Sequence, residues 1–212
     1  MSRIERWAPL SGLLAVVLWI VGIVLLTHDN PPDHASDADI LAWYKADSNS
    51  VLLGGWLFML GCLAFLWFVA ILRDRFAAAG TAPTATRLTF AGAIAATVLG
   101  LGIPATDIAA AIDKNDISAA TAGAFHHLSD GFFVAAEMAL IVVFLAGAVA
   151  ALRTAVLPKW WAWLMVLVAV VLVIGPIGWA ALIFGTPIWV LGTTAMLLRR
   201  PADRREISPS TA

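Results

Sequence analysis

The chain has 212 residues, of which 61% are hydrophobic and only 13% are charged, and its formal net charge is −1. Soluble domains carry about 25% charged residues, so this composition excludes a soluble globular fold and a disordered chain, and the small net charge gives no reason to expect a nucleic-acid partner. The single cysteine, Cys62, excludes an intramolecular disulfide, a multi-cysteine metal centre and two-cysteine redox chemistry. We therefore expect an integral membrane protein.

Four apolar runs are long enough to cross a bilayer, because a helix needs about 20 residues to span about 30 Å of hydrocarbon. These runs cover residues 8–27, 51–72, 88–112 and 131–152. The first run follows Arg3 and Arg6, as the apolar region of a cleaved signal peptide would. It exceeds the usual length of about 7–15 residues for such a region, and no small-residue cleavage site follows it. We therefore expect it to be retained as a helix.

The stretch from Trp160 to Leu198 contains no charged residue and is too long for one crossing. We predict two helices, at 160–179 and 182–198, with a turn near Trp179 to Phe184, because glycine and proline residues interrupt the run. The sequence thus predicts a single domain over residues 1–200, an all-α bundle of six transmembrane helices.

Basic residues are distributed very unevenly between the two predicted sides of the membrane. With the N-terminus in the cytoplasm, 11 of the 13 Lys and Arg residues fall on the cytoplasmic side, and the other two are Lys45 and Lys114. The positive-inside rule then places both termini in the cytoplasm, together with a polar tail at residues 201–212 that we expect to be disordered. Ten of the 14 acidic residues fall on or near the outer side. We expect a multi-pass protein of the plasma (inner) membrane, with an acidic outer face.

The loop after the first helix contains a signal for the start of another helix. Residues Ser36 to Asp39 match a capping box with Asp in the fourth position. Ile40, Trp43 and Tyr44 follow at the spacing i, i+3 and i+4, which places them on one helical face. We predict a short helix over residues 37–46 with Trp43 turned toward the membrane or the bundle, where it serves either as packing or as a lid.

The next outer loop contains an Ala-rich stretch, Ser118 to Leu128, that favours a helix. Joined to the fourth span, it would give a helix of about 54 Å at 1.5 Å per residue. The sequence leaves two alternatives: this helix projects beyond the membrane, or it breaks near Ser129 to Gly131.

Ionisable residues near the outer ends of the third and fourth spans form the candidate ligand-binding site. His127, Asp130 and Glu137 are spaced for one stripe along a helix, and Asp107 ends the preceding span, whose outer end should lie beside this stripe. By helix rise, Glu137 lies about 6 Å inside the outer interface, where a charge is unfavourable unless it is paired or hydrated. We expect Glu137 to face the bundle interior, either protonated or bound to a cation.

Each of these residues also has a purely structural explanation. Glu137, protonated or hydrogen-bonded to an indole such as that of Trp56, would hold helices together. His127 and Asp130 would form a solvated helix end, where water reaches both side chains.

Several enzyme and cofactor classes do not fit the sequence. A rhomboid-type serine protease needs a buried serine and histidine, but the one serine within a predicted span, Ser11, lies near the cytoplasmic end. Haem-binding histidine pairs, a P-loop and a Rossmann glycine pattern are absent. The adjacent rings of His126 and His127 point about 100° apart on a helix, which is unfavourable for one metal ion. We therefore expect no cofactor.

Four sequence stretches carry a resemblance to a known family. They are Ile40 to Tyr44 (ILAWY), Leu57 to Phe76 (LFMLGCLAFLWFVAILRDRF), Leu157 to Trp161 (LPKWW) and Gly175 to Gly178 (GPIG). Together they resemble small six-helix membrane proteins of actinobacteria, and the nearest named group is the DUF4386-like family. The resemblance implies a multi-pass helical bundle and assigns no functional residues.

The sequence therefore predicts a non-enzymatic membrane protein, accessory or sensory, whose acidic outer vestibule binds a cation or a small ligand. The alternative is a membrane-embedded enzyme acting on lipid, or a metal-assisted hydrolase, that uses Asp107, His127, Asp130 and Glu137. A transporter is disfavoured because no ionisable residue lies in the inner half of any span. Convergence of the four side chains to metal-ligand distances would favour the enzyme, and their separation would favour the binding protein.

Overall fold

The computed structural model describes residues 7–32 and 34–199, and within these ranges the chain forms helices and no strand. The helices are α2 (Leu10–Leu26), α3 (Asp37–Ala79), α4 (Pro83–Ile112), α5 (Ala119–Thr154), α6 (Lys159–Val173), α7 (Gly175–Ala180), η1 (Ala181–Gly185) and α8 (Thr186–Arg199). The predicted tail, residues 201–212, lies outside the described residues. The all-α prediction is confirmed for the part of the chain that is described.

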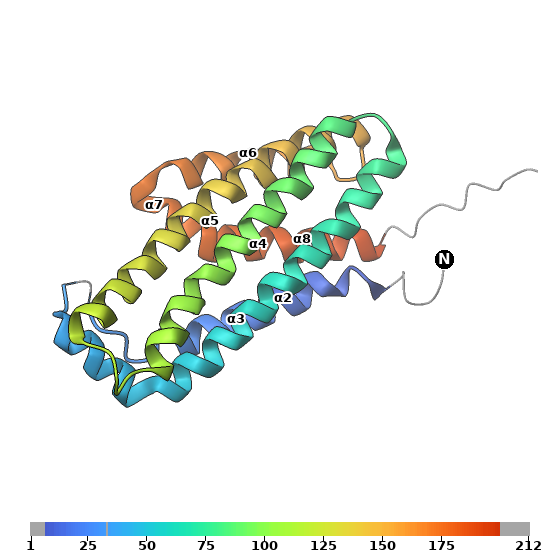
Figure 1. Cartoon of the computed structure of the whole chain (residues 1–212). Helices are drawn as coiled ribbons and strands as arrows, with labels where there is room; N and C mark the ends of the chain where they lie inside the picture. The colour runs from blue at the N-terminus through green and yellow to red at the C-terminus, as the bar shows by residue number, and fades with distance from the viewer. Residues whose placement is uncertain (1–6, 33, 200–212) are drawn as a thin grey trace, which may run out of the picture.

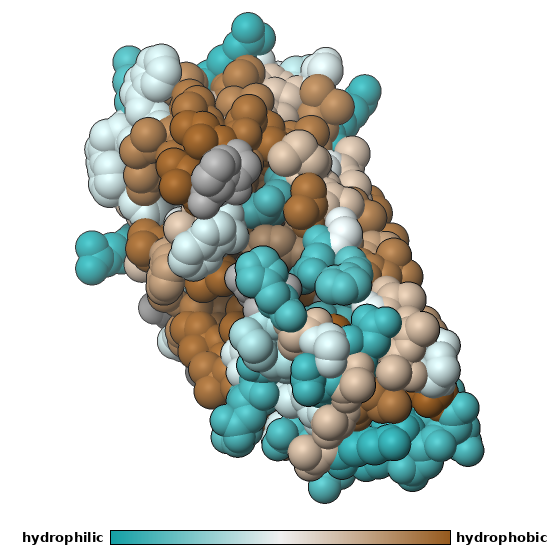
Figure 2. Space-filling model, turned by 90° about the vertical axis from the view of Figure 1, so that its left-hand side faces the viewer, coloured by the Kyte–Doolittle hydropathy of each residue, from teal (hydrophilic) through white to brown (hydrophobic). Residues whose placement is uncertain are grey.

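Four of these segments are long and apolar enough to cross a membrane: α3, α4, α5 and the continuous helical stretch Ile177–Arg199. The helices α2 and α6 are also apolar, but they have only 17 and 15 residues. Large side chains such as Trp67 and Val98 are more than half exposed on the helix surfaces, as expected where lipid replaces water. Figure 2 shows hydrophobic residues over much of one face, with hydrophilic residues gathered over its lower part. By length and composition, the chain is a helical bundle with four helices suited to crossing a membrane.

The helices pack as a bundle in which chain neighbours lie side by side (Figure 1). α3 contacts α2, α4 and α5, and α8 returns to contact α2. In the core, the indole of Trp189 on α8 is fully buried and its ring lies edge-on to those of Phe68 and Phe144. α2 and α3 approach backbone to backbone, since a Cβ on Gly22 would lie 2.7 Å from the backbone nitrogen of Phe58.

The short helix predicted over residues 37–46 is confirmed as the first part of α3. The Ser36 hydroxyl accepts from the Asp39 N–H, and the Asp39 carboxylate accepts from the Ser36 N–H, which completes the predicted capping box. Ile40, Trp43 and Tyr44 are all buried, and Trp43 Nε1 donates to the His28 carbonyl at 3.1 Å. Asp47 has non-helical dihedral angles (φ −111°, ψ 18°), so a kink separates this helix from the rest of α3.

The Ala-rich stretch and the fourth predicted span form one uninterrupted helix. Ser118 caps α5 by accepting from the Thr121 N–H, and α5 then runs for 36 residues with no break at residues 129–131. Of the two alternatives, the long helix is the observed one. Its first turns carry polar side chains past the apolar segment, and these turns provide half of the site described below.

The predicted turn between the fifth and sixth helices is wrong, because residues 179–184 are helical. The chain instead breaks at Ile174 (φ −84°, ψ 87°), where α6 ends. Pro176 has no N–H to bond with the carbonyl four residues earlier, which favours a break at this point. The chain then resumes as α7, the π-helical segment η1 and α8, and the wider π-helical turn ends two residues before Pro187. The observed helices therefore cover 159–173 and 175–199.

Candidate functional site

The Asp107 carboxyl group lies at the junction of three helices. It belongs to α4, one turn beyond Pro104, and the residue is 7% exposed. Tyr44 Oη, from the short helix at the start of α3, donates to Asp107 Oδ1 at 2.6 Å. Ser129 Oγ of α5 lies 3.0 Å from Asp107 Oδ2 and 2.9 Å from the Ile103 carbonyl, so its hydroxyl hydrogen has two acceptors. Asp107 is thus a buried carboxyl group that hydroxyls hold from two neighbouring helices.

His126 completes this group of side chains. Its Nδ1 lies 3.8 Å from Asp107 Oδ1, and that nitrogen is buried with no hydrogen-bond partner. The imidazole packs edge-on against the rings of Trp43 and Tyr44. His126 lies on α5 before the predicted span at 131–152. The Asp107 carboxylate raises the pKa of His126 above its usual value, and burial of the imidazole opposes this shift.

The structure does not bring the four predicted ligand residues together. His127 and Asp130 are exposed, and they contact each other, with 3.8 Å between Nδ1 and Oδ2. Glu137 is 5% exposed and therefore faces the interior, as predicted, but its Oε1 lies against Gly178 and has no hydrogen-bond partner. The predicted bond from the Trp56 indole to Glu137 is not observed, and Trp56 is exposed.

Tyr44, His126 and Ser129 are the members of the site that the sequence did not identify. Residues 126 and 137 are about three helical turns apart, so His126 shares the buried face of α5 with Glu137, whereas His127 is turned away by about 100°. Tyr44 was predicted on the buried face of its helix, and a buried tyrosine hydroxyl needs a hydrogen-bond partner. The need of the buried Tyr44 hydroxyl for a partner was the one feature of the sequence that pointed to a contact such as that with Asp107.

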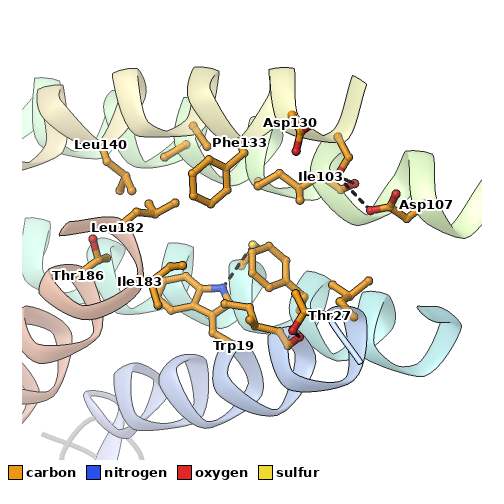
Figure 3. Close-up of a pocket in the computed structure, with 18 of the residues that line it drawn as sticks. Trp19, Thr27, Ile103, Asp107, Asp130, Phe133, Leu140, Leu182, Ile183 and Thr186 are labelled. Carbon is orange, nitrogen blue, oxygen red and sulfur yellow. Dashed lines mark hydrogen bonds between the residues drawn. The ribbon is translucent and has the colours of Figure 1, made fainter. Parts of the chain in front are cut away.

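A partly open cavity of about 250 Å³ extends from this polar group into the bundle between α2, α3, α4, α5 and the η1–α8 segment. Asp107 and Asp130 lie at one end, and Leu140, Leu182 and Thr186 lie at the other (Figure 3). The lining between the two ends is mainly apolar. The cavity therefore has one polar end and an apolar interior.

Polar atoms within the apolar part of the cavity are few. Trp19 Nε1 contacts Cys62 Sγ at 3.5 Å, as the dashed line to the sulfur in Figure 3 shows. Thr97 is 4% exposed, and its Oγ1 has no hydrogen-bond partner although it belongs to the cavity wall. A buried hydroxyl without a partner is unfavourable by about 1–3 kcal/mol, so Thr97 Oγ1 is an unsatisfied polar atom in the cavity wall.

The geometry around Asp107 differs from that of a serine hydrolase. In such enzymes the histidine contacts the serine hydroxyl as its base, and the aspartate orients the histidine. Here Ser129 and His126 both face Asp107, so the carboxyl group lies between them. The arrangement positions a carboxylate and does not activate the serine.

Three potential metal ligands come together elsewhere on the described surface. His28 Nδ1 lies 3.5 Å from an oxygen of Asp29 and 3.7 Å from an oxygen of Asp47. His28 and Asp29 are exposed, and this group is separate from the four predicted residues, which do not form such a cluster among the described residues.

Comparisons with protein-family models, with curated protein sequences and with solved structures found no match to this chain. The resemblance to the DUF4386-like family therefore stays a prediction.

Proposed function

We propose that this protein binds a small amphipathic molecule inside its helical bundle and acts as a non-catalytic accessory or sensory protein of the plasma membrane. The observation that carries the proposal is the apolar cavity with the hydrogen-bonded carboxyl group of Asp107 at one end. The cavity volume lies just below the usual range of about 300–1,000 Å³ for small-molecule sites. Such sites are mainly apolar with a few placed polar groups.

The direction of binding follows from the two ends of the cavity. A polar head group would lie beside Asp107, His126 and Asp130, and the hydrocarbon part would extend toward Leu140 and Leu182. Reversing the molecule would bury its polar group among leucines, which is unfavourable without a hydrogen bond. The ligand is therefore small and has its polar group at one end.

The proposal includes six membrane crossings with both termini in the cytoplasm. In support, the described basic residues Arg73, Arg87, Arg153 and Lys159 lie where α3 and α5 end and where α4 and α6 begin, at one end of the bundle (Figure 1). Lys45 and Lys114 lie at the opposite end, beside the site. On the positive-inside rule, the polar end of the cavity faces the outer side.

We favour binding over catalysis because the four residues of the enzyme alternative are dispersed. Asp107 contacts Tyr44 and Ser129, and Glu137 lies against Gly178. A metal-assisted hydrolase needs several ligands around one position, usually with a water bound there. That convergence is absent among the four described side chains.

Two alanine substitutions on α4 test the proposal. Ala96 is buried and lines the cavity, whereas Ala95 is exposed on the outside of the same helix. Ligand-observed NMR on the protein in lipid nanodiscs would measure binding of phenethyl alcohol, a small neutral amphiphile. We expect wild type and Ala95→Phe to bind it and Ala96→Phe to lose binding, because the added ring fills the cavity. Equal binding to all three proteins would refute the proposed site.

A further inference from the structure

We infer that the molecule held in this cavity is an organic cation, an amine or quaternary ammonium group attached to an aromatic or short aliphatic body. The inference rests on the proposed function and adds the charge and chemical class of the ligand. It is carried by two independent features of the cavity wall, the sign of its ionisable groups and its aromatic rings.

The ionisable side chains at the polar end are mainly acidic. Asp107 and Asp130 contribute carboxyl groups, His126 is the basic member, and the described cavity wall contains no Lys or Arg. The nearby Lys114 is hydrogen-bonded to Ser48 and does not line the cavity. An anionic head group would meet two carboxyl groups with no permanent positive charge to pair with it. A cation would find an opposite charge at the same position.

Aromatic rings surround the path from the polar end into the bundle. They belong to Trp19, Trp43, Phe58, Phe65 and Phe133, which come from α2, α3 and α5. The face of an aromatic ring carries negative charge density and attracts ammonium groups, most strongly where water is excluded. Rings combined with a carboxylate are the arrangement that recognises alkylated ammonium groups, and this combination favours an organic cation over a neutral molecule of the same shape.

The same features disfavour a bare metal ion in the cavity. Calcium takes six to eight oxygen ligands, and magnesium requires near-octahedral coordination. At Asp107, both carboxyl oxygens already have hydroxyl neighbours, from Tyr44 and Ser129. A metal ion would also leave the apolar part of the cavity empty, whereas the body of an organic cation fills it.

Three probes with the same hydrocarbon body and different head groups test the inference: phenethylamine as the cation, phenethyl alcohol as the neutral molecule and phenylacetate as the anion. Each is titrated by ligand-observed NMR against the protein in nanodiscs of zwitterionic lipid, and binding to Ala96→Phe is subtracted as background. We expect the cation to bind about tenfold more tightly than the alcohol and the anion to bind most weakly.

Charge-neutralising variants identify the source of the preference. We expect Asp107→Asn to remove most of the difference between cation and alcohol. Because Asp107 is buried, that variant could fail to fold, and Asp130→Asn then serves instead. Because Asp130 is exposed, Asp130→Asn should lower cation affinity by a smaller factor, about two- to threefold. Its affinity for the alcohol should be unchanged. The matched control is Asp116→Asn, which removes the same charge at an exposed outer position away from the cavity and should leave both affinities unchanged.

The outcomes separate this inference from the proposed function. If the alcohol binds in the cavity but the cation binds no more tightly, the organic-cation assignment is wrong and the proposed function stands. If Asp116→Asn lowers cation affinity as much as Asp130→Asn does, the preference comes from the general surface charge, and the assignment is again wrong. If none of the three probes binds above the Ala96→Phe background, both proposals are overturned.

Discussion

A substitution at Gly22 tests whether the close backbone contact between α2 and α3 holds the bundle together. A Cβ at this position would lie 2.7 Å from the Phe58 nitrogen and 2.9 Å from the Gly54 carbonyl oxygen. Both neighbours are backbone atoms, so no side-chain rotation relieves the contact and the helices must move apart. The matched control is Gly131 on α5, also within a helix, where a Cβ would meet no atom within 4 Å.

The expected difference between Gly22→Ala and Gly131→Ala follows from two terms. Replacing Gly by Ala within a helix favours the folded state by about 0.8–1.0 kcal/mol, and this term applies to both variants. Overpacking against neighbours that cannot move freely opposes it at Gly22 alone, by about 1–3 kcal/mol. We therefore expect Gly131→Ala to be stabilised by up to about 1 kcal/mol, and Gly22→Ala to be less stable than it by about 1–3 kcal/mol.

Reversible unfolding in mixed micelles, with increasing SDS and helix content read by circular dichroism, would measure both free energies of unfolding. The comparison between the two variants removes the helix-propensity term and leaves the packing term. If Gly22→Ala and Gly131→Ala change the free energy of unfolding equally, the close approach of α2 to α3 is not a stabilising contact and the packing described here is wrong.

Three further predictions concern the site and the topology. Tyr44→Phe removes the donor to the buried Asp107 carboxyl group and should lower the free energy of unfolding by about 1–3 kcal/mol, whereas Thr27→Val, at an exposed hydroxyl bonded within its own helix, should change it little. Protonated His126 would offset the charge of Asp107. Because Asp107 raises the pKa of His126, the affinity for a permanently charged probe such as phenethyltrimethylammonium should rise with pH through this raised pKa. The other titratable groups near the imidazole are Tyr44 on α3 and His127 and Asp130 on α5. His126→Gln should flatten the pH profile if His126 is its source, and a profile that His127→Gln flattens instead would contradict this assignment. A reporter fused after residue 212 should be active only in the cytoplasm, and activity on the outer side would exclude the six-span topology.

Features that depend on neighbouring residues along the chain were predictable from the sequence. The capping box at Ser36 and the buried face with Trp43 and Tyr44 are set by spacing within a few residues, and the structure has both. The apolar runs likewise predicted the helices, because hydrocarbon requires backbone hydrogen bonds to be made within each segment. The break at Ile174 was missed because several glycines and prolines compete over this stretch, and local propensity does not rank them.

The site itself was decided by tertiary structure. Sequence spacing placed His127, Asp130 and Glu137 on one stripe, but spacing does not say which face of α5 meets α4. The packing of α3 and α4 selects the face that carries His126 and Ser129, about 100° from the exposed His127. Tyr44 is 63 positions from Asp107 in the chain, and the two meet where the short helix, separated by the kink at Asp47, packs against the C-terminal part of α4. A contact between distant residues depends on how whole helices pack, and periodicity within one helix carries no information about it.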